Sequence, residues 1–202
     1  MDVINLTADA DVFTANAYLI RGDANALVDA GAAAGIVSAI REHVSALDAV
    51  ALTHRHEDHV EQLEAIRDAF DPTVYAARAG PEDATVLDDG EKLSLGGHPF
   101  EAVATPGHAP DHLGFVGDRA VFTGDVVVYS DGAFDDGSFG RTDLAGGDRG
   151  TLLASIERLL DRLPGTVESL YPGHGPAFQG DVRAVLERAH TRAARGEPKY
   201  PE

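Results

Sequence analysis

The chain has 202 residues, 44% of them hydrophobic, and a formal net charge of -18 at pH 7. Its length and apolar content suffice for one well-cored domain, or for two small halves packed face to face, and they exclude a disordered chain. The negative charge makes nucleic acid and anionic membranes unfavourable partners, and the absence of cysteine excludes disulfides and thiolate metal ligands.

The first residues, MDVINLTADADVF, are acidic where a signal peptide has a basic segment. No run approaches the roughly 18 apolar residues of a membrane-spanning helix. We therefore expect a cytoplasmic protein that does not bind membranes. The acidic residues are spread along the whole chain, which indicates the solvated surface of a halophilic protein from a salty cytoplasm rather than an acidic binding tail.

The first half of the chain is predicted to form short strands interrupted by two helices. Gly22 and Asp23 separate two apolar segments and predict a hairpin. Apolar residues at helical spacing predict helices over 31–44 and 60–70, the second closed by Asp71-Pro72. Apolar segments predict strands over 3–6, 17–20, 25–31, 49–53 and 73–77.

The second half begins with a strand-rich region, residues 85–130, in which Gly and Pro punctuate short apolar segments. Helices are predicted over 151–163 and 181–194, with a strand over 167–171 between them. This order of elements suits two sheets with helices outside them, which is a four-layer α/β sandwich.

Several predicted strands end in residues that bind metal ions. Loops at strand ends carry function because a rigid sheet can aim several of them at one point. The segment THRHEDH (53–59) follows one strand, and three later strands each end near a single His or Asp. The metal-ligand candidates are His54, His56, Asp58, His59, His108, Asp125 and His174.

The spacing of these candidates suggests two groups. His54 and His56 are alternate residues of an extended segment, so both side chains can point the same way. Asp58 and His59 fall at the start of the next helix and approach from another side. Each ion would then have three ligands and a shared carboxylate, with room for a water molecule. The groups are His54, His56 and His108 for one ion, Asp58, His59 and His174 for the other, and Asp125 as the bridge.

The remaining polar candidates have weaker support. We expect no metal at His43, His98 and His190, since a lone histidine in a polar setting is usually an ordinary polar residue and not a metal ligand. Asp29 and His112 are candidates for holding ligand histidines by hydrogen bonds, although ordinary capping or core satisfaction explains each of them equally well.

Together these motifs resemble the metallo-β-lactamase superfamily. The matching segments are THRHEDH (53–59), TPGHAPDH (105–112), FTGD (122–125) and YPGHG (171–175), in the family's order. The resemblance implies an α/β fold, a four-layer αββα sandwich over residues 1–202 as a single domain, with two divalent metal ions bound at the strand ends between the sheets. Carried over to this chain, the ligands are the seven residues named above. Zinc is favoured, and iron and manganese suit the same donors.

A narrower resemblance lies in GSFGRTDLAGGDRGTLLASI (137–156), which is similar to the short hydroxyacylglutathione hydrolases, or glyoxalase II type. Those enzymes cleave thioesters such as lactoylglutathione. The resemblance implies that a hydroxide bridging the two ions hydrolyses a thioester of a small thiol. Asp58 would bind the second ion and orient the nucleophile, and the thiolate would leave without acid help because thiol pKa values are low.

The chain also departs from the family pattern. The first motif continues with Glu61-Gln62 in place of a Gly pair, and VVVYSDGAFDDGSF (126–139) is longer and more acidic than expected. Arg141 is the one evident cationic residue for gripping the small-molecule substrate. The identity of the thiol therefore stays open.

Two other functions use the same fold. A persulfide dioxygenase also carries GRTD and binds one iron through the positions of His54, His108 and Asp125, but the hydrolase-like YPGHG argues against it. A phosphodiesterase or RNA-processing nuclease shares the ligand set, but the net charge and the lack of a basic patch argue against nucleic acid. A β-lactamase and a non-catalytic metal-binding module are less favoured. The oligomeric state is not predicted.

Overall fold

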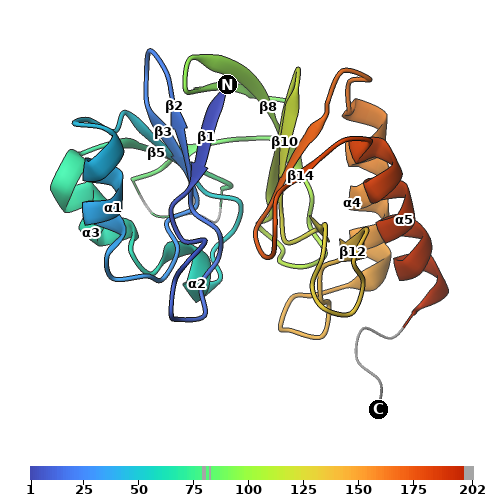
Figure 1. The fold of residues 1–202 in the computed structure, drawn as a ribbon. Coiled ribbons are helices and arrows are strands. Elements are labelled where there is room, and N and C mark those ends of the chain that lie inside the picture. The colour runs from blue at the N-terminus through green and yellow to red at the C-terminus, as the bar shows by residue number, and fades with distance from the viewer. Residues whose placement is uncertain (79–80, 82, 198–202) are drawn as a thin grey trace.

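The computed structural model describes residues 1–78, 81 and 83–197, and it consists of two sheets that face each other with helices on their outer sides (Figure 1). The first sheet has the order β1-β2-β3-β4-β5-β6 and the second β14-β13-β10-β9-β8-β7. The four-layer α/β sandwich expected from the order of elements is confirmed. Of the described helices, none is long and apolar enough to cross a membrane.

The first sheet begins with an antiparallel hairpin and continues with parallel strands. β1 pairs with β2 and β2 with β3 in antiparallel register, whereas β3, β4, β5 and β6 run parallel to one another. Parallel neighbours require crossovers, and α1 and α3 supply two of them on the outer face. The strands are Asp2–Asn5, Tyr18–Arg21, Ala26–Val28, Ala49–Ala51, Thr73–Ala76 and Thr85–Val86, and the helices α1, α2 and α3 are Ile36–His43, Glu57–Val60 and Leu63–Phe70.

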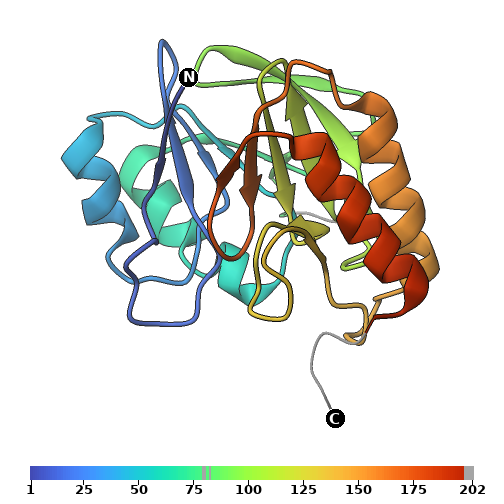
Figure 2. The ribbon, with the colours of Figure 1, turned by 45° about the vertical axis from the view of Figure 1, so that its right-hand side comes forward.

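The second sheet is antiparallel except where β10 pairs with β13 in parallel register. Helices α4 and α5 cover its outer face, and they form the right flank in Figures 1 and 2. The strands β7 to β10 are Lys92–Leu95, His98–Ala104, Leu113–Gly117 and Ala120–Gly124; β13 and β14 are Ser169–Pro172 and Phe178–Gln179; and α4 and α5 are Arg149–Arg162 and Val182–Arg195.

Strand alternation divides the apolar residues among three core layers. On β2, Tyr18 and Ile20 face the second sheet, whereas Leu19 between them faces α1 and α3. Phe115 and Phe122 of the second sheet complete the layer between the sheets. The burial of this inner layer sets the distance between the two sheets and thus the width of the edge where the site lies.

Two predicted helices begin later than expected, for reasons visible in the backbone. The helix predicted from residue 31 starts at Ile36, because Gly31 has a φ of 67° that a right-handed helix does not accommodate. The helix predicted over 60–70 is preceded by a separate short helix. A continuous helix would need the carbonyl of His59, which instead accepts the backbone N–H groups of Ala30 and Gly31 at 2.8 and 3.1 Å.

The VVVY segment forms a separate hairpin rather than a strand of the main sheet. β11 (Val127–Val128) pairs with β12 (Ser138–Phe139) in a small two-stranded sheet. The residues between them are held against α5, because Arg192 donates to the carboxylate of Asp136 at 2.8 Å and its guanidinium lies over the ring of Phe134. The long acidic segment noted in the sequence is thus held by α5 beside the strand ends.

Candidate metal centre

The metal-ligand candidates gather at one edge of the two sheets. His54 and His56 follow β4, Asp58 and His59 lie on α2, and His108 lies in the loop between β8 and β9. The sheets are joined at this edge, where the backbone N–H of Leu113 donates to the carbonyl of Thr53 at 2.7 Å. Asp125 and His174 follow β10 and β13, so loops from both sheets supply the group.

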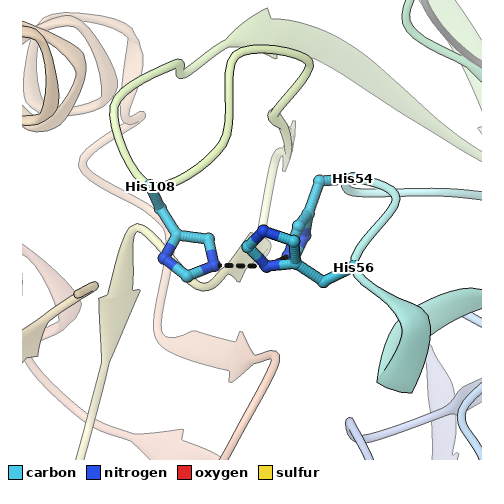
Figure 3. A group of neighbouring side chains, drawn as sticks. All are labelled: His54, His56 and His108. Atoms are coloured by element: carbon cyan, nitrogen blue, oxygen red, sulfur yellow. Dashed lines mark hydrogen bonds between the residues drawn. The ribbon is translucent and has the colours of Figure 1, made fainter. Parts of the chain in front are cut away.

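The first three-residue group consists of His54, His56 and His108 (Figure 3). Nδ1 of His56 lies 3.0 Å from Nε2 of His54 and 2.9 Å from Nε2 of His108. The three rings come from two loops of different sheets and turn one nitrogen each towards the same point. Such a convergence of imidazole nitrogens suits a transition metal ion.

The second group consists of Asp58, His59 and His174. Nε2 of His174 lies 3.0 Å from Oδ2 of Asp58, and Nε2 of His59 lies 3.9 Å from the same oxygen. His59 is fully buried, whereas Asp58 and His174 are half-buried and line the cleft. This group offers two nitrogens and one carboxylate oxygen.

Asp125 lies between the two groups. Its Oδ1 is 3.4 Å from Nε2 of His59, and its Oδ2 is 3.4 Å from Nε2 of both His108 and His174. One carboxylate therefore reaches nitrogens of both groups. This is the position that a residue shared by two metal ions must occupy.

Two buried atoms support a bound cation at this point. Nε2 of His59 and Oδ1 of Asp125 are buried, and neither has a hydrogen-bond partner among the described residues. The two atoms lie 3.4 Å from each other, and because an unpaired buried polar atom costs free energy, a cation bound to both would stabilise them. The loop of Gly173 packs closely against both groups, because a Cβ at Gly173 would overlap Oδ1 of Asp125 and lie 2.8 Å from Cε1 of His59.

Asp29 orients His59 from the far side of the ring. Its Oδ2 accepts the Nδ1 hydrogen of His59 at 2.9 Å, and its two oxygens also accept the hydroxyl and the backbone N–H of Thr53, each at 2.8 Å. Asp29 is buried and has a φ of 58°, which only a few residue types tolerate. These bonds direct Nε2 of His59 towards the cluster.

Two further contacts hold His108 and Asp125. Nδ1 of His108 donates to the backbone carbonyl of Arg141 at 2.8 Å, which leaves Nε2 free to face the cluster. The backbone N–H of Asp125 donates to Nε2 of His112 at 3.1 Å, and Nδ1 of His112 bonds to the hydroxyl of Thr105 at 2.7 Å. Asp29 thus bonds to a candidate ligand histidine, as expected, whereas the hydrogen bonds of His112 go to the backbone of Asp125 and to Thr105 instead of a histidine.

The electrostatics of the cluster follow from burial and from its carboxylates. Burial lowers the pKa of His54 well below its ordinary value and also lowers that of His108, so both rings stay neutral. Burial opposes a charge on His59 too, but Asp29 and Asp125 raise the pKa of His59 well above its ordinary value. The neighbouring histidines hold the pKa of Asp125 well below its ordinary value despite burial. The site thus carries an ionised oxygen donor at Asp125 and neutral nitrogen donors at His54 and His108, whereas the carboxylates around His59 favour its protonated form until a cation replaces that proton.

A cleft of about 790 Å³ opens onto both groups. Phe13, which is 81% exposed, stacks on His174 with ring centroids 5.3 Å apart and forms one rim. Arg141 also lines the cleft, but its guanidinium donates to both carboxylate oxygens of Asp143 at 2.8 and 2.7 Å. Arg149 lines the cleft as well.

Several residues of the site have no signal in the sequence. Phe13 lies in an irregular loop, and Thr53 is the first residue of THRHEDH but not a metal donor. Asn16 and Tyr18 hold the loop of His174, because both donate to the carbonyl of Pro172 at 2.9 Å. Their importance arises from contacts more than 150 residues apart in the chain. His43, His98 and His190 lie outside the groups of metal-type residues found among the described residues.

Comparisons with known proteins relate this chain to one superfamily. A family model described as the metallo-beta-lactamase superfamily matches residues 10–85 and 76–174. The chain is 43% identical over 121 residues to the hydroxyacylglutathione hydrolase of Ruegeria pomeroyi, covering 55% of this chain and 48% of that protein. The chain spans about half the length of such curated relatives or less. It is 33% identical over 187 residues to the "Probable metallo-hydrolase YqgX" of Bacillus subtilis, covering 80% of this chain and 85% of that one.

Solved structures share the fold over nearly the whole chain. ETHE1 from Myxococcus xanthus is 27% identical with a TM-score of 0.75, covering 98% of this chain and 87% of that one. TTHA1623 in a di-iron-bound form is 27% identical with a TM-score of 0.72, covering 94% of this chain and 98% of that one.

Proposed function

Because this chain belongs to the metallo-beta-lactamase superfamily, we propose that it is a metal-dependent hydrolase that cleaves a thioester of a small thiol. The names of its relatives, hydroxyacylglutathione hydrolase and metallo-hydrolase, support hydrolysis. The observation that carries the proposal is the position of Asp125, which lies within 3.4 Å of nitrogens from both ligand groups and has one oxygen without a hydrogen-bond partner among the described residues. In this proposal residues 1–202 act as one domain.

The cluster fits two divalent ions. His54, His56 and His108 would hold the first, Asp58, His59 and His174 the second, and Asp125 both. The donors are imidazole nitrogens and carboxylate oxygens alone, a set that suits zinc, iron or manganese. The di-iron form of a structural neighbour supports two ions, and zinc is the ion we favour.

Two such ions supply Lewis acidity, since they polarise a carbonyl and lower the pKa of water. The chain's own residues place the reactants. Asp58 faces the cleft and can accept a hydrogen bond from the attacking water. This hydrogen bond would orient the water. The buried rings of His54 and His59 exclude solvent from the inner side of the site. A thiolate leaving group needs no proton donor.

The cleft beside the ligands would hold the rest of a small-molecule substrate. Phe13 offers an apolar rim next to His174. Arg141 stays a candidate substrate contact, although Asp143 already engages its guanidinium. The chain's net charge of -18 supports a small molecule over nucleic acid.

The test is metal quantification on the purified protein together with four substrates: lactoylglutathione, a lactone, a persulfide and bis-p-nitrophenyl phosphate. We expect about two ions per chain and hydrolysis of the thioester. One iron per chain with oxygen uptake on the persulfide would instead identify a dioxygenase. Cleavage of the phosphodiester without cleavage of the thioester would identify a phosphodiesterase.

A further inference from the structure

Arg149 differs from the other arginines of this acidic chain. The chain contains 16 Lys and Arg residues and 34 Asp and Glu residues. Throughout the described residues, every other arginine has a carboxylate, a backbone carbonyl or an aromatic ring as a partner. Within that same part of the chain, the guanidinium of Arg149 has no such contact. Arg149 is exposed, and among the described residues it is the arginine whose guanidinium is still available to an external group.

The position of Arg149 is not explained by the stability of its own helix. Arg149 is the first residue of α4, and a cation at a helix N-terminus is disfavoured by the helix dipole. Its guanidinium lies instead against the end of α5, since a Cβ at Gly196 would come within 2.9 Å of Nη1. The side chain is thereby held beside the cleft that opens onto the metal-ligand groups.

The acids that share this cleft are already engaged. Asp143 accepts two hydrogen bonds from Arg141, and Asp131 accepts from Ser138 at 2.7 Å. Glu197 lies 3.6 Å from Arg195. Of the described charged groups that line the cleft, and setting aside the metal-ligand candidates, Arg149 is the one left without a partner. Among the described residues, the cleft therefore presents an unpaired positive group in a protein of strongly negative charge.

We propose that Arg149 binds a carboxylate of the substrate, so that the preferred thioester is anionic. The planar guanidinium can donate two parallel hydrogen bonds to a carboxylate, and such charge-assisted pairs are strong and directional. This inference rests on the proposed hydrolysis of thioesters and adds the chemical class of the substrate. The carboxylate could belong to the acyl half or to the thiol half, and the two sources can be separated experimentally.

The test uses four synthetic thioesters with the metal-loaded protein. They combine a propanoyl or a succinyl group with N-acetylcysteamine or 3-mercaptopropionate, so that the carboxylate is absent, on the acyl half, on the thiol half, or on both. We expect the wild type to prefer one single-carboxylate substrate over the neutral one. Arg149→Gln should lower kcat/KM for that substrate about tenfold, mainly through KM, and should change the neutral substrate less than about twofold. Arg149→Lys keeps the charge but not the planar guanidinium, so its kcat/KM for that substrate should lie between the values of the wild type and of Arg149→Gln.

Arg119→Gln is the matched control. It removes the same charge from an exposed ion pair with Glu168 that does not line the cleft. If Arg119→Gln acts like Arg149→Gln, the effect belongs to the overall charge and the proposal is wrong. An equal loss on the neutral and charged substrates in Arg149→Gln, or no loss on either, would also overturn it.

A binding measurement keeps this inference separate from the proposed function. If the wild type cleaves none of the thioesters, the proposed function fails, and calorimetry with 3-(methylthio)propanoate and its amide still tests Arg149. We expect the carboxylate to bind about tenfold more tightly than the amide in the wild type, and Arg149→Gln to abolish that difference. A difference that persists in the variant, or that is absent in the wild type, would contradict a carboxylate site at Arg149.

Discussion

The carboxylate of Asp29 accepts the Nδ1 hydrogen of His59 over 2.9 Å and so directs the other ring nitrogen towards Asp125. This bond links an orienting residue of the first sheet to the candidate bridging carboxylate that follows β10 of the second sheet. It also sets the tautomer of His59, because an imidazole that donates through Nδ1 keeps Nε2 free to bind a metal. The first prediction tests this relationship.

Asp29→Asn should weaken metal binding by about 10- to 100-fold. The amide can keep an acceptor for the backbone of Thr53, but it then presents an N–H group to the ring of His59 and disfavours the required tautomer. Asn tolerates the left-handed backbone as well as Asp does, so the fold should be retained. Competition with a chromogenic chelator measures the affinity. Asp71→Asn is the control, since Asp71 has a φ of 51° and ends α3 away from the site; equal metal loss in both variants would refute the role of Asp29.

His56→Ala should reduce the metal content from about two ions to about one per chain and abolish thioester hydrolysis. Nδ1 of His56 lies between the nitrogens of His54 and His108, so its removal leaves the first group with two histidines. Elemental analysis and a thioester assay on the same preparation are the measurements. His43→Ala, at the exposed end of α1, should change neither value. An unchanged metal content and unchanged hydrolysis in His56→Ala would rule out the two-ion assignment.

Gly173→Ala should disrupt the second group while sparing the first. The added Cβ would overlap Oδ1 of Asp125 and crowd His59, and over-packing of this kind costs about 1–3 kcal/mol of unfolding free energy. We expect loss of one ion and a lower melting temperature. Gly165→Ala places its Cβ in open space and should have little effect on either. If Gly173→Ala kept both ions, the close packing of this loop against Asp125 would not matter for the site.

The stability of the protein should fall with pH above about 10, and Tyr18 should contribute to this fall. Burial raises the pKa of Tyr18 above its ordinary value, so the folded state keeps the phenol neutral where the unfolded chain ionises. The contribution is therefore complete below the unfolded pKa and is lost as the pH rises, by at most about 1.4 kcal/mol per pH unit. Denaturant unfolding of wild type and Tyr18→Phe between pH 8 and 11 measures the slopes. The variant should be less stable at pH 8, because it lacks the bond to Pro172, but should show the shallower slope. Equal slopes would contradict this.

Much of the fold could be predicted because alternation and helical spacing are local properties. In the strands around Leu19 and Phe115, the local order of apolar residues already indicates which side chains are buried. The start of α3 could not be predicted, because the carbonyl of His59 accepts backbone N–H groups from residues nearly thirty positions earlier. The start of α1 depends on the positive φ of Gly31. The same holds for VVVY, whose pairing with β12 depends on contacts with α5.

The sequence by itself determined which side chains leave the strand ends, since Gly and Pro set sharp exits there and the spacing of His54, His56, Asp58 and His59 is a local matter. Only the tertiary structure decided which of these atoms face one another. The packing of two sheets placed Asp125 between both groups and turned His59 through Asp29. Among the described residues it also left Arg149 without a partner, whereas Arg141 pairs with Asp143. These relationships join residues that are far apart in the chain, and the distance between them is set by the burial of the apolar layer between the sheets rather than by any local pattern.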